Sequence, residues 1–77
     1  MNETINPDPD TITIIANGQP RSVKASSTIA DLLQELKIKP IRVVAQLNGV
    51  IVPRSEFNQA VLQQDCKLEL VTMVGGG

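Results

Sequence analysis

The chain has 77 residues and a net charge of −1, with 42% of its residues hydrophobic and 19% charged. This length supports one small domain, and this composition is too apolar for a fully disordered chain. The basic residues are scattered and Phe57 is the one aromatic residue, which excludes the basic patch and stacking platform of a nucleic-acid-binding protein.

Residues 1–10 are polar and acidic and include Pro7 and Pro9. They have neither the basic start nor the apolar stretch of a signal peptide, so we expect a flexible extension before a domain at residues 11–74. No apolar run reaches the length of a membrane span, so no membrane association is expected. The expected compartment is the cytoplasm.

The first predicted element is a strand at residues 11–16, where β-branched residues alternate so that Ile12 and Ile14 face the core. Asn17-Gly18 follows, a pair that tolerates the positive φ angles of a type I′ turn. We therefore expect an antiparallel hairpin with a second strand at residues 21–25.

A helix is predicted to begin after Thr28, because Thr28 and Asp31 have the spacing of a capping box. Its apolar residues fall on one stripe: Ile29, Leu32, Leu33 and Leu36. Lys37 and Lys39 suit the negative end of the helix, and Pro40 is expected to stop it.

A second hairpin is predicted from residues 41–47 and 50–52, joined by Asn48-Gly49, with Pro53 restricting the second strand to a sheet edge. Residues 54–64 have a mixed pattern. A short helical turn there would place Phe57 and Val61 in the core.

The last predicted strand covers residues 67–73, with Leu68 and Leu70 on its inner face. Its outer face becomes apolar at Val71 and Met73. We interpret this change as the edge of a docking surface, although isolated exposed apolar residues are also common.

These elements predict an α+β roll: a mixed sheet of four to five strands with one main helix packed across one face. We expect the last strand to be central in the sheet. In that arrangement the residues that follow it leave the domain from a firm position.

The residue types narrow the chemistry. Histidine is absent and Cys66 is the only cysteine, which excludes a Ser-His-Asp or Cys-His centre, an internal disulfide and a thiolate zinc cluster. We expect no metal site and no autonomous enzyme, and we interpret Cys66 as a structural or incidental thiol.

The sequence ends in Gly75, Gly76 and Gly77, directly after an apolar strand. Residues without a Cβ accept either sign of φ and add no width, so this flexible tail could enter a narrow slot and present its carboxylate. The alternative is a frayed end or a cloning scar.

Three segments together resemble the ThiS family of ubiquitin-like β-grasp proteins, the sulfur carriers of thiamine biosynthesis: TIADLL at 28–33, LNGVIVPRSEF at 47–57 and LELVTMVGGG at 68–77. The small subunit of molybdopterin synthase is similar in fold and terminus but has a proline-rich approach to the glycines, which is missing here. Where the family commonly has Gly-Asp before the last strand, this chain has Gln64-Asp65.

The resemblance implies a protein co-substrate without a bound cofactor. A separate E1-like activating enzyme would use ATP and Mg²⁺ to adenylate the carboxylate of Gly77. A sulfur donor such as a cysteine desulfurase would then convert it to a thiocarboxylate, which thiazole synthase would use.

In this scheme Gly75 and Gly76 thread the tail into a partner, and Val71, Met73 and Val74 contact that partner. Arg54, from the VPR segment, is a further candidate contact or a solvated loop residue. Two alternatives remain from sequence: a carrier for molybdopterin, and a β-grasp interaction module without tail chemistry.

Overall fold

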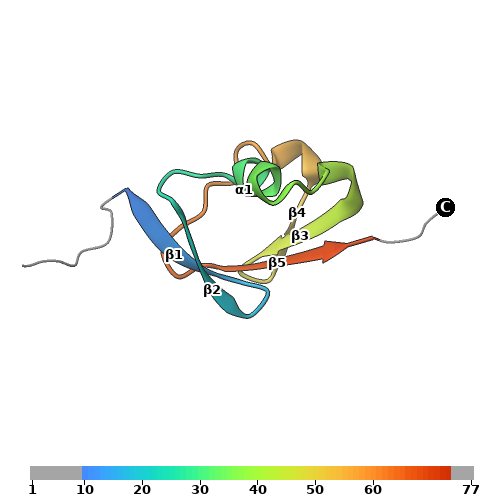
Figure 1. The fold of residues 1–77 in the computed structure, drawn as a ribbon. Coiled ribbons are helices and arrows are strands. Elements are labelled where there is room, and N and C mark those ends of the chain that lie inside the picture. Colours follow the sequence, from blue (N-terminus) through green and yellow to red (C-terminus); the bar gives the residue numbers. More distant parts are fainter. Residues whose placement is uncertain (1–9, 74–77) are drawn as a thin grey trace, which may run out of the picture.

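Five strands, one α-helix and two short 3-10 turns make up the computed structural model, which describes residues 10–73 (Figure 1). In chain order they are β1 (Thr11–Ala16), β2 (Gln19–Lys24), α1 (Ile29–Leu36), η1 (Pro40–Arg42), β3 (Val43–Leu47), β4 (Val50–Val52), η2 (Arg54–Glu56) and β5 (Lys67–Thr72).

The strands form one mixed sheet in the order β2-β1-β5-β3-β4. β5 runs parallel to β1 and antiparallel to β3, so the last strand is central, as predicted. Figure 1 shows α1 and η2 on one side of this sheet, and no described element covers the other side. The predicted α+β roll with one helix across one face is confirmed.

Both Asn-Gly pairs form the tight turns that the sequence predicts. Asn17 and Gly18 have φ angles of 51° and 83°, and Asn48 and Gly49 have 52° and 86°. The strands pair directly beside each turn, so β2 begins at Gln19 instead of residue 21. Pro20 is tolerated there because β2 is an edge strand.

The helix begins with the predicted capping box. The Thr28 hydroxyl accepts a hydrogen bond from the Asp31 amide at 3.2 Å, and the Thr28 amide donates to the Asp31 carboxylate at 3.0 Å. Its end differs from the prediction, because Lys37 adopts a left-handed conformation with φ of 61° and closes the helix before Pro40.

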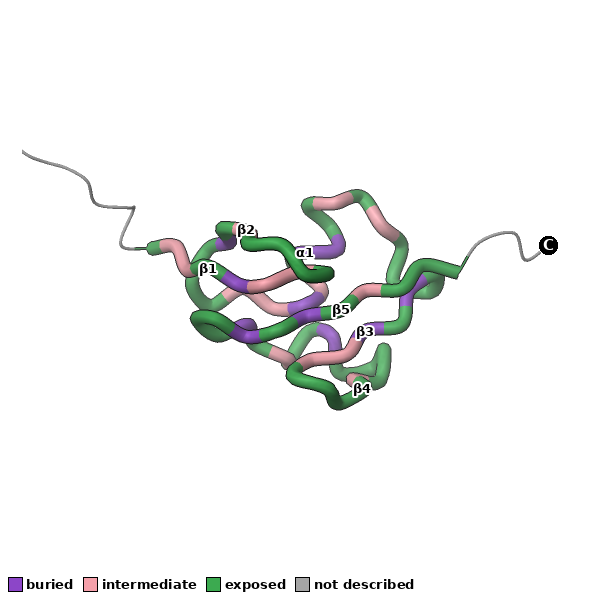
Figure 2. The backbone as a smooth tube through the Cα atoms, turned by 90° about the horizontal axis from the view of Figure 1, so that it is seen from below, coloured by how far each residue is buried: buried purple, intermediate pink, exposed green. Residues whose placement is uncertain are grey.

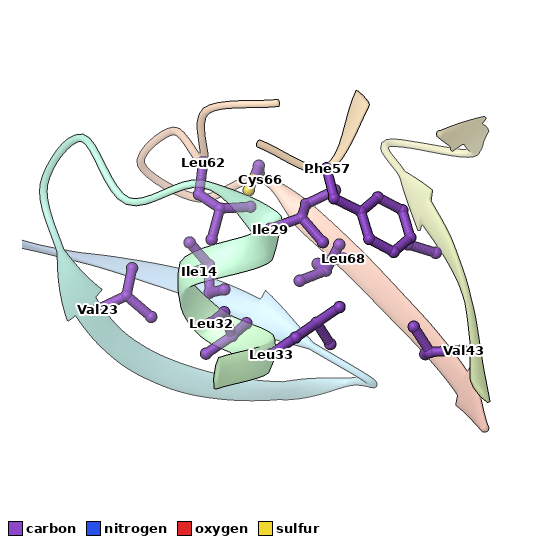
Figure 3. Packing of buried hydrophobic residues seen from close by; sticks show 11 residues of the cluster. Ile14, Val23, Ile29, Leu32, Leu33, Val43, Phe57, Leu62, Cys66 and Leu68 are labelled. Carbon is purple, nitrogen blue, oxygen red and sulfur yellow. The ribbon is translucent and has the colours of Figure 1, made fainter. Parts of the chain in front are cut away.

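The core lies between α1 and the sheet, where helix side chains face residues of β1, β3 and β5 (Figure 3). The largest fully buried side chains are Ile14, Ile29, Leu32, Leu33, Leu62 and Leu68. Burying a side chain of this size contributes about 1.5–3 kcal/mol relative to leaving it in water. The predicted helix stripe is therefore the main apolar cover of the sheet.

Two predicted core or strand positions are wrong. Ile41 is exposed in η1, since Pro40 starts a 3-10 turn and β3 begins only at Val43. Val61 is also exposed, because residues 57–62 do not continue as a helix. Val61 instead forms an isolated bridge with Thr28, and in such an extended segment the next side chain, Leu62, points to the core.

Candidate functional site

The carboxyl end of β5 is the place where the central strand leaves the core. Leu68 is fully buried, Leu70 is half-buried, and Val71, Thr72 and Met73 are exposed (Figure 2). β5 is thus fixed in the hydrophobic core at its start and projects from it at its end.

Hydrogen bonds hold β5 against β3 along this whole path. The strands pair from Leu47 opposite Leu68 to Val43 opposite Thr72. Beyond the strand, the Met73 amide donates to the Arg42 carbonyl at 2.7 Å. Regular backbone pairing therefore reaches the last described residue, which supports the predicted firm exit.

Asn17 holds the other side of β5. Its backbone amide donates to the Leu68 carbonyl at 2.8 Å. Its side-chain oxygen accepts from the Leu70 amide at 2.7 Å, and its side-chain nitrogen donates to the Leu70 carbonyl at 3.1 Å. The Asn17 side chain therefore replaces one peptide unit of a neighbouring strand and extends the β1 side of the sheet by one step.

Asn48 plays a similar part at the beginning of β5. Its side-chain oxygen accepts from the Lys67 amide at 2.9 Å, and its backbone amide donates to the Lys67 carbonyl at 2.7 Å. Sequence reasoning assigned both asparagines to turn geometry alone. The repeated Asn-Gly pair in the sequence predicts two tight turns, but it does not indicate that either asparagine also contacts β5.

The uncovered face of the sheet carries an apolar surface next to this exit. Val71 and Met73 lie on that face and are 61% and 53% exposed. Val44 lies opposite Val71 on β3, and Ile51 on β4 faces the same way because it is paired with Gln46. We call Val44, Ile51, Val71 and Met73 the outer patch. The predicted exposure of Val71 and Met73 is confirmed.

Arg54 is not part of this surface. It is exposed in η2, which follows β4, and β3 separates β4 from β5 in the sheet. The Arg54 carbonyl accepts a bond from the Phe57 amide at 3.1 Å and so supports the local turn. The other predicted site residues, Val74, Gly75, Gly76 and Gly77, lie outside the described residues.

The described part of the chain offers little chemistry of its own. Within residues 10–73 no group of three or more His, Cys, Asp or Glu side chains is placed to hold a metal ion. The Cys66 thiol is only 5% exposed and packs in the core. No helix in the same range is long and apolar enough to cross a membrane.

Comparison with known proteins relates the whole arrangement to one family. A family model described as the ThiS family matches residues 8–77. The crystal structure of the thiamine biosynthesis protein (ThiS) from Geobacter metallireducens is similar with a TM-score of 0.73 and 28% sequence identity. That similarity covers 86% of this chain and 100% of that one.

Sequence relatives are of two lengths. The uncharacterized protein ycf40 of Pyropia yezoensis is 35% identical over 66 residues, which are 86% of this chain and 93% of that protein. The thiazole synthase of Paramagnetospirillum magneticum is 38% identical over 64 residues, which are 83% of this chain and 20% of that protein. A thiazole synthase of Magnetococcus marinus is 36% identical, and the aligned part is 19% of its length. The chain thus spans about a fifth of these two enzymes.

Proposed function

Since this chain belongs to the ThiS family, the sulfur carriers of thiamine biosynthesis, we propose that its reacting group is the carboxylate of Gly77. In this proposal an activating enzyme adenylates the carboxylate: one carboxylate oxygen forms a bond to the α-phosphorus of ATP, and pyrophosphate leaves. The outer sulfur of the donor's cysteine persulfide then attacks the carbonyl carbon, and AMP departs to leave an acyl disulfide. A second thiol attacks the donor cysteine sulfur of that disulfide and breaks the S–S bond. The products are a C-terminal thiocarboxylate and a disulfide between the second thiol and the donor cysteine.

The observation that carries this proposal is the family match, which continues through the three glycines to residue 77. The fold supplies the physical support for it, because β5 is held on both sides up to Leu70, by β3 up to Thr72, and by the Arg42 carbonyl of η1 at Met73. A fixed strand that continues into residues without side chains can deliver a carbonyl group into a partner's active site. The proposal takes Gly77 as the C-terminal residue of the working protein.

The partner that consumes the sulfur is, in our proposal, thiazole synthase. The two relatives of that name contain a region similar to this chain as about a fifth of their length. A domain that occurs within the same polypeptide as an enzyme commonly acts beside that enzyme. The ThiS family match likewise favours thiamine biosynthesis over the molybdopterin alternative.

The other functional roles follow from this scheme. Val71, Met73 and Val74 contact the partner, while Gly75 and Gly76 pass through its narrow channel. ATP and Mg²⁺ belong to the activating enzyme, and the sulfur comes from a donor such as a cysteine desulfurase in the cytoplasm. We assign Arg54 to a separate contact, because it lies in η2, which follows the edge strand β4.

Intact-mass analysis tests the proposal. The chain is incubated with ATP, Mg²⁺, a sulfur source and an activating enzyme that loads a known carrier. We expect the mass to increase by the difference between sulfur and oxygen, and we expect fragmentation to place the change in the C-terminal peptide. A chain with one alanine appended after Gly77 is the control and is expected to stay unloaded. An unchanged mass of the original chain would refute the proposal and favour an interaction module.

A further inference from the structure

β5 is a central strand at its beginning and an edge strand at its end. β1 pairs with it only through Ile15 opposite Lys67 and Ala16 opposite Leu68. β1 then turns away into the Asn17-Gly18 hairpin, while β3 continues beside β5 to Thr72. The side of β5 that faces β1 therefore has no strand beside its last residues in the described part of the chain.

The hydrogen bonds show which backbone groups point to this open side. Lys67 and Met73 bond toward β3 and the residues flanking it, whereas Leu68 and Leu70 bond to Asn17 on the β1 side. Backbone groups alternate in direction along a strand. Thr72 therefore directs its N–H and C=O to the same side as Leu68 and Leu70.

Asn17 ends the pairing on this side at Leu70. Its side-chain amide offers one carbonyl oxygen and one nitrogen, and both are directed to the Leu70 backbone. The corresponding groups of Thr72 lie two residues further along the strand, about 6.6–6.8 Å away. Among residues 10–73, Thr72 thus presents the first donor and acceptor pair of the β1 side that has no backbone or Asn17 partner.

We propose that an extended segment of thiazole synthase adds to the open side of β5 and makes its first hydrogen bonds with the N–H and C=O of Thr72. This inference rests on the proposed function, because it takes thiazole synthase as the partner. Adding a strand to an exposed sheet edge is a common way to bind an extended segment, in which main-chain bonds provide affinity and side-chain contacts provide specificity.

Two observations favour this occupant. The region similar to this chain is part of the same polypeptide as thiazole synthase in two relatives, which keeps the two regions close to each other there. In addition, the four residues after Met73 span at most about 13–14 Å, so the surface around an acceptor's active site has to approach the end of β5 closely. Val71 and Met73 of the outer patch flank the open edge and offer apolar contacts to the same partner.

Backbone amide hydrogen exchange of the full chain tests the pairing directly. We expect the Thr72 amide to exchange rapidly in the free protein and at least about tenfold more slowly with saturating thiazole synthase. The Met73 amide, already bonded to the Arg42 carbonyl, is the internal reference and is expected to change less. An unchanged exchange rate of the Thr72 amide with thiazole synthase bound would overturn the inference. So would a result in which the activating enzyme protects this amide and thiazole synthase does not.

A pair of substitutions gives a second test. Thr72→Pro removes the donor on the open side without removing a bond to β3, and proline is tolerated at such an edge position. Thr72→Val keeps the donor and a similar shape. By titration calorimetry we expect Thr72→Pro to bind thiazole synthase about tenfold more weakly than Thr72→Val, the loss typical of one hydrogen bond at an interface. Equal affinities would contradict the proposal.

The two levels of inference fail in different ways. If the chain accepts sulfur but Thr72 is not protected by thiazole synthase, the strand addition is wrong and the carrier function stands. If the chain is not loaded at all, the carrier function is wrong. If Thr72→Pro does not fold, as judged by circular dichroism, the exchange measurement on the unsubstituted protein decides.

Discussion

Removing the Asn17 side chain should loosen the strand that leads to the tail. Asn17→Gly eliminates the two side-chain hydrogen bonds to Leu70. The glycine adopts the φ of 51° at this position without strain, so the turn itself is preserved. Each bond contributes about 0.5–1.5 kcal/mol, and because both are solvent-exposed the lower half of that range applies. We therefore expect Asn17→Gly to lower the free energy of unfolding by about 1–2 kcal/mol.

A second substitution separates the bonds from the turn. Asn17→Ala loses the same two bonds and, unlike the glycine variant, keeps a Cβ in the left-handed region without the polar side chain that lets asparagine adopt it, which costs about 1–2 kcal/mol relative to Asn17→Gly. The assay is urea unfolding monitored by circular dichroism, because the chain has no tryptophan or tyrosine to report by fluorescence. For a domain of this size, 1 kcal/mol corresponds to a shift of about 4–8 °C in Tm.

The outcome of this pair decides whether Asn17 braces β5. If Asn17→Gly is as stable as the original protein while Asn17→Ala is destabilised, Asn17 matters only as a turn residue and the bracing argument is refuted. If both are destabilised, and Leu70 amide exchange accelerates in both, the side chain stabilises the strand itself.

Three further substitutions test the carrier and its surface. Gly76→Val is expected to block adenylation, measured as ATP-dependent release of pyrophosphate. The circular dichroism spectrum is expected to stay unchanged. Normal adenylation would argue against a narrow channel in the partner. Cys66→Ser is expected to accept sulfur at the normal rate, because the thiol is buried. Burying a hydroxyl in its place is expected to lower the free energy of unfolding by about 1 kcal/mol. If the folded variant were not loaded with sulfur, the thiol would have a chemical role. Val71→Asp is expected to weaken binding to thiazole synthase at least about tenfold, whereas Val50→Asp, at a similarly exposed position of β4 (66% against 61%), is expected to have little effect. Equal effects of the two would mean that the outer patch is not the contact surface.

The elements that sequence analysis identified correctly are those with a complete local signal. The Asn-Gly turns need only two residues, and the capping box of Thr28 and Asp31 needs four. The alternation in β5 is similarly local and was sufficient to predict the exposure of Val71 and Met73. In each case the residues that specify the element also lie within it.

The errors arose where a distant contact decides the local structure. Val61 points outward because its segment is bridged to Thr28, far away in sequence, and not because of its own neighbours. The paired bonds between Asn17 and Leu70 join residues 53 positions apart, so no local pattern could indicate them. The helix end at Lys37 was missed for a different reason. The residue that closes a helix in the left-handed conformation is usually glycine or asparagine, so a lysine at that position gave no signal.

The central position of β5 has a consequence for biosynthesis. The strand is the last of the sheet in chain order, yet it joins β1, which comes first, to β3. While the ribosome is still translating the chain, the two hairpins and the helix therefore lack the piece that unites them. A product whose translation stops before β5 cannot complete its core and becomes a substrate for cellular proteases. The domain can therefore complete its fold only after translation has passed β5, the last strand before the glycines.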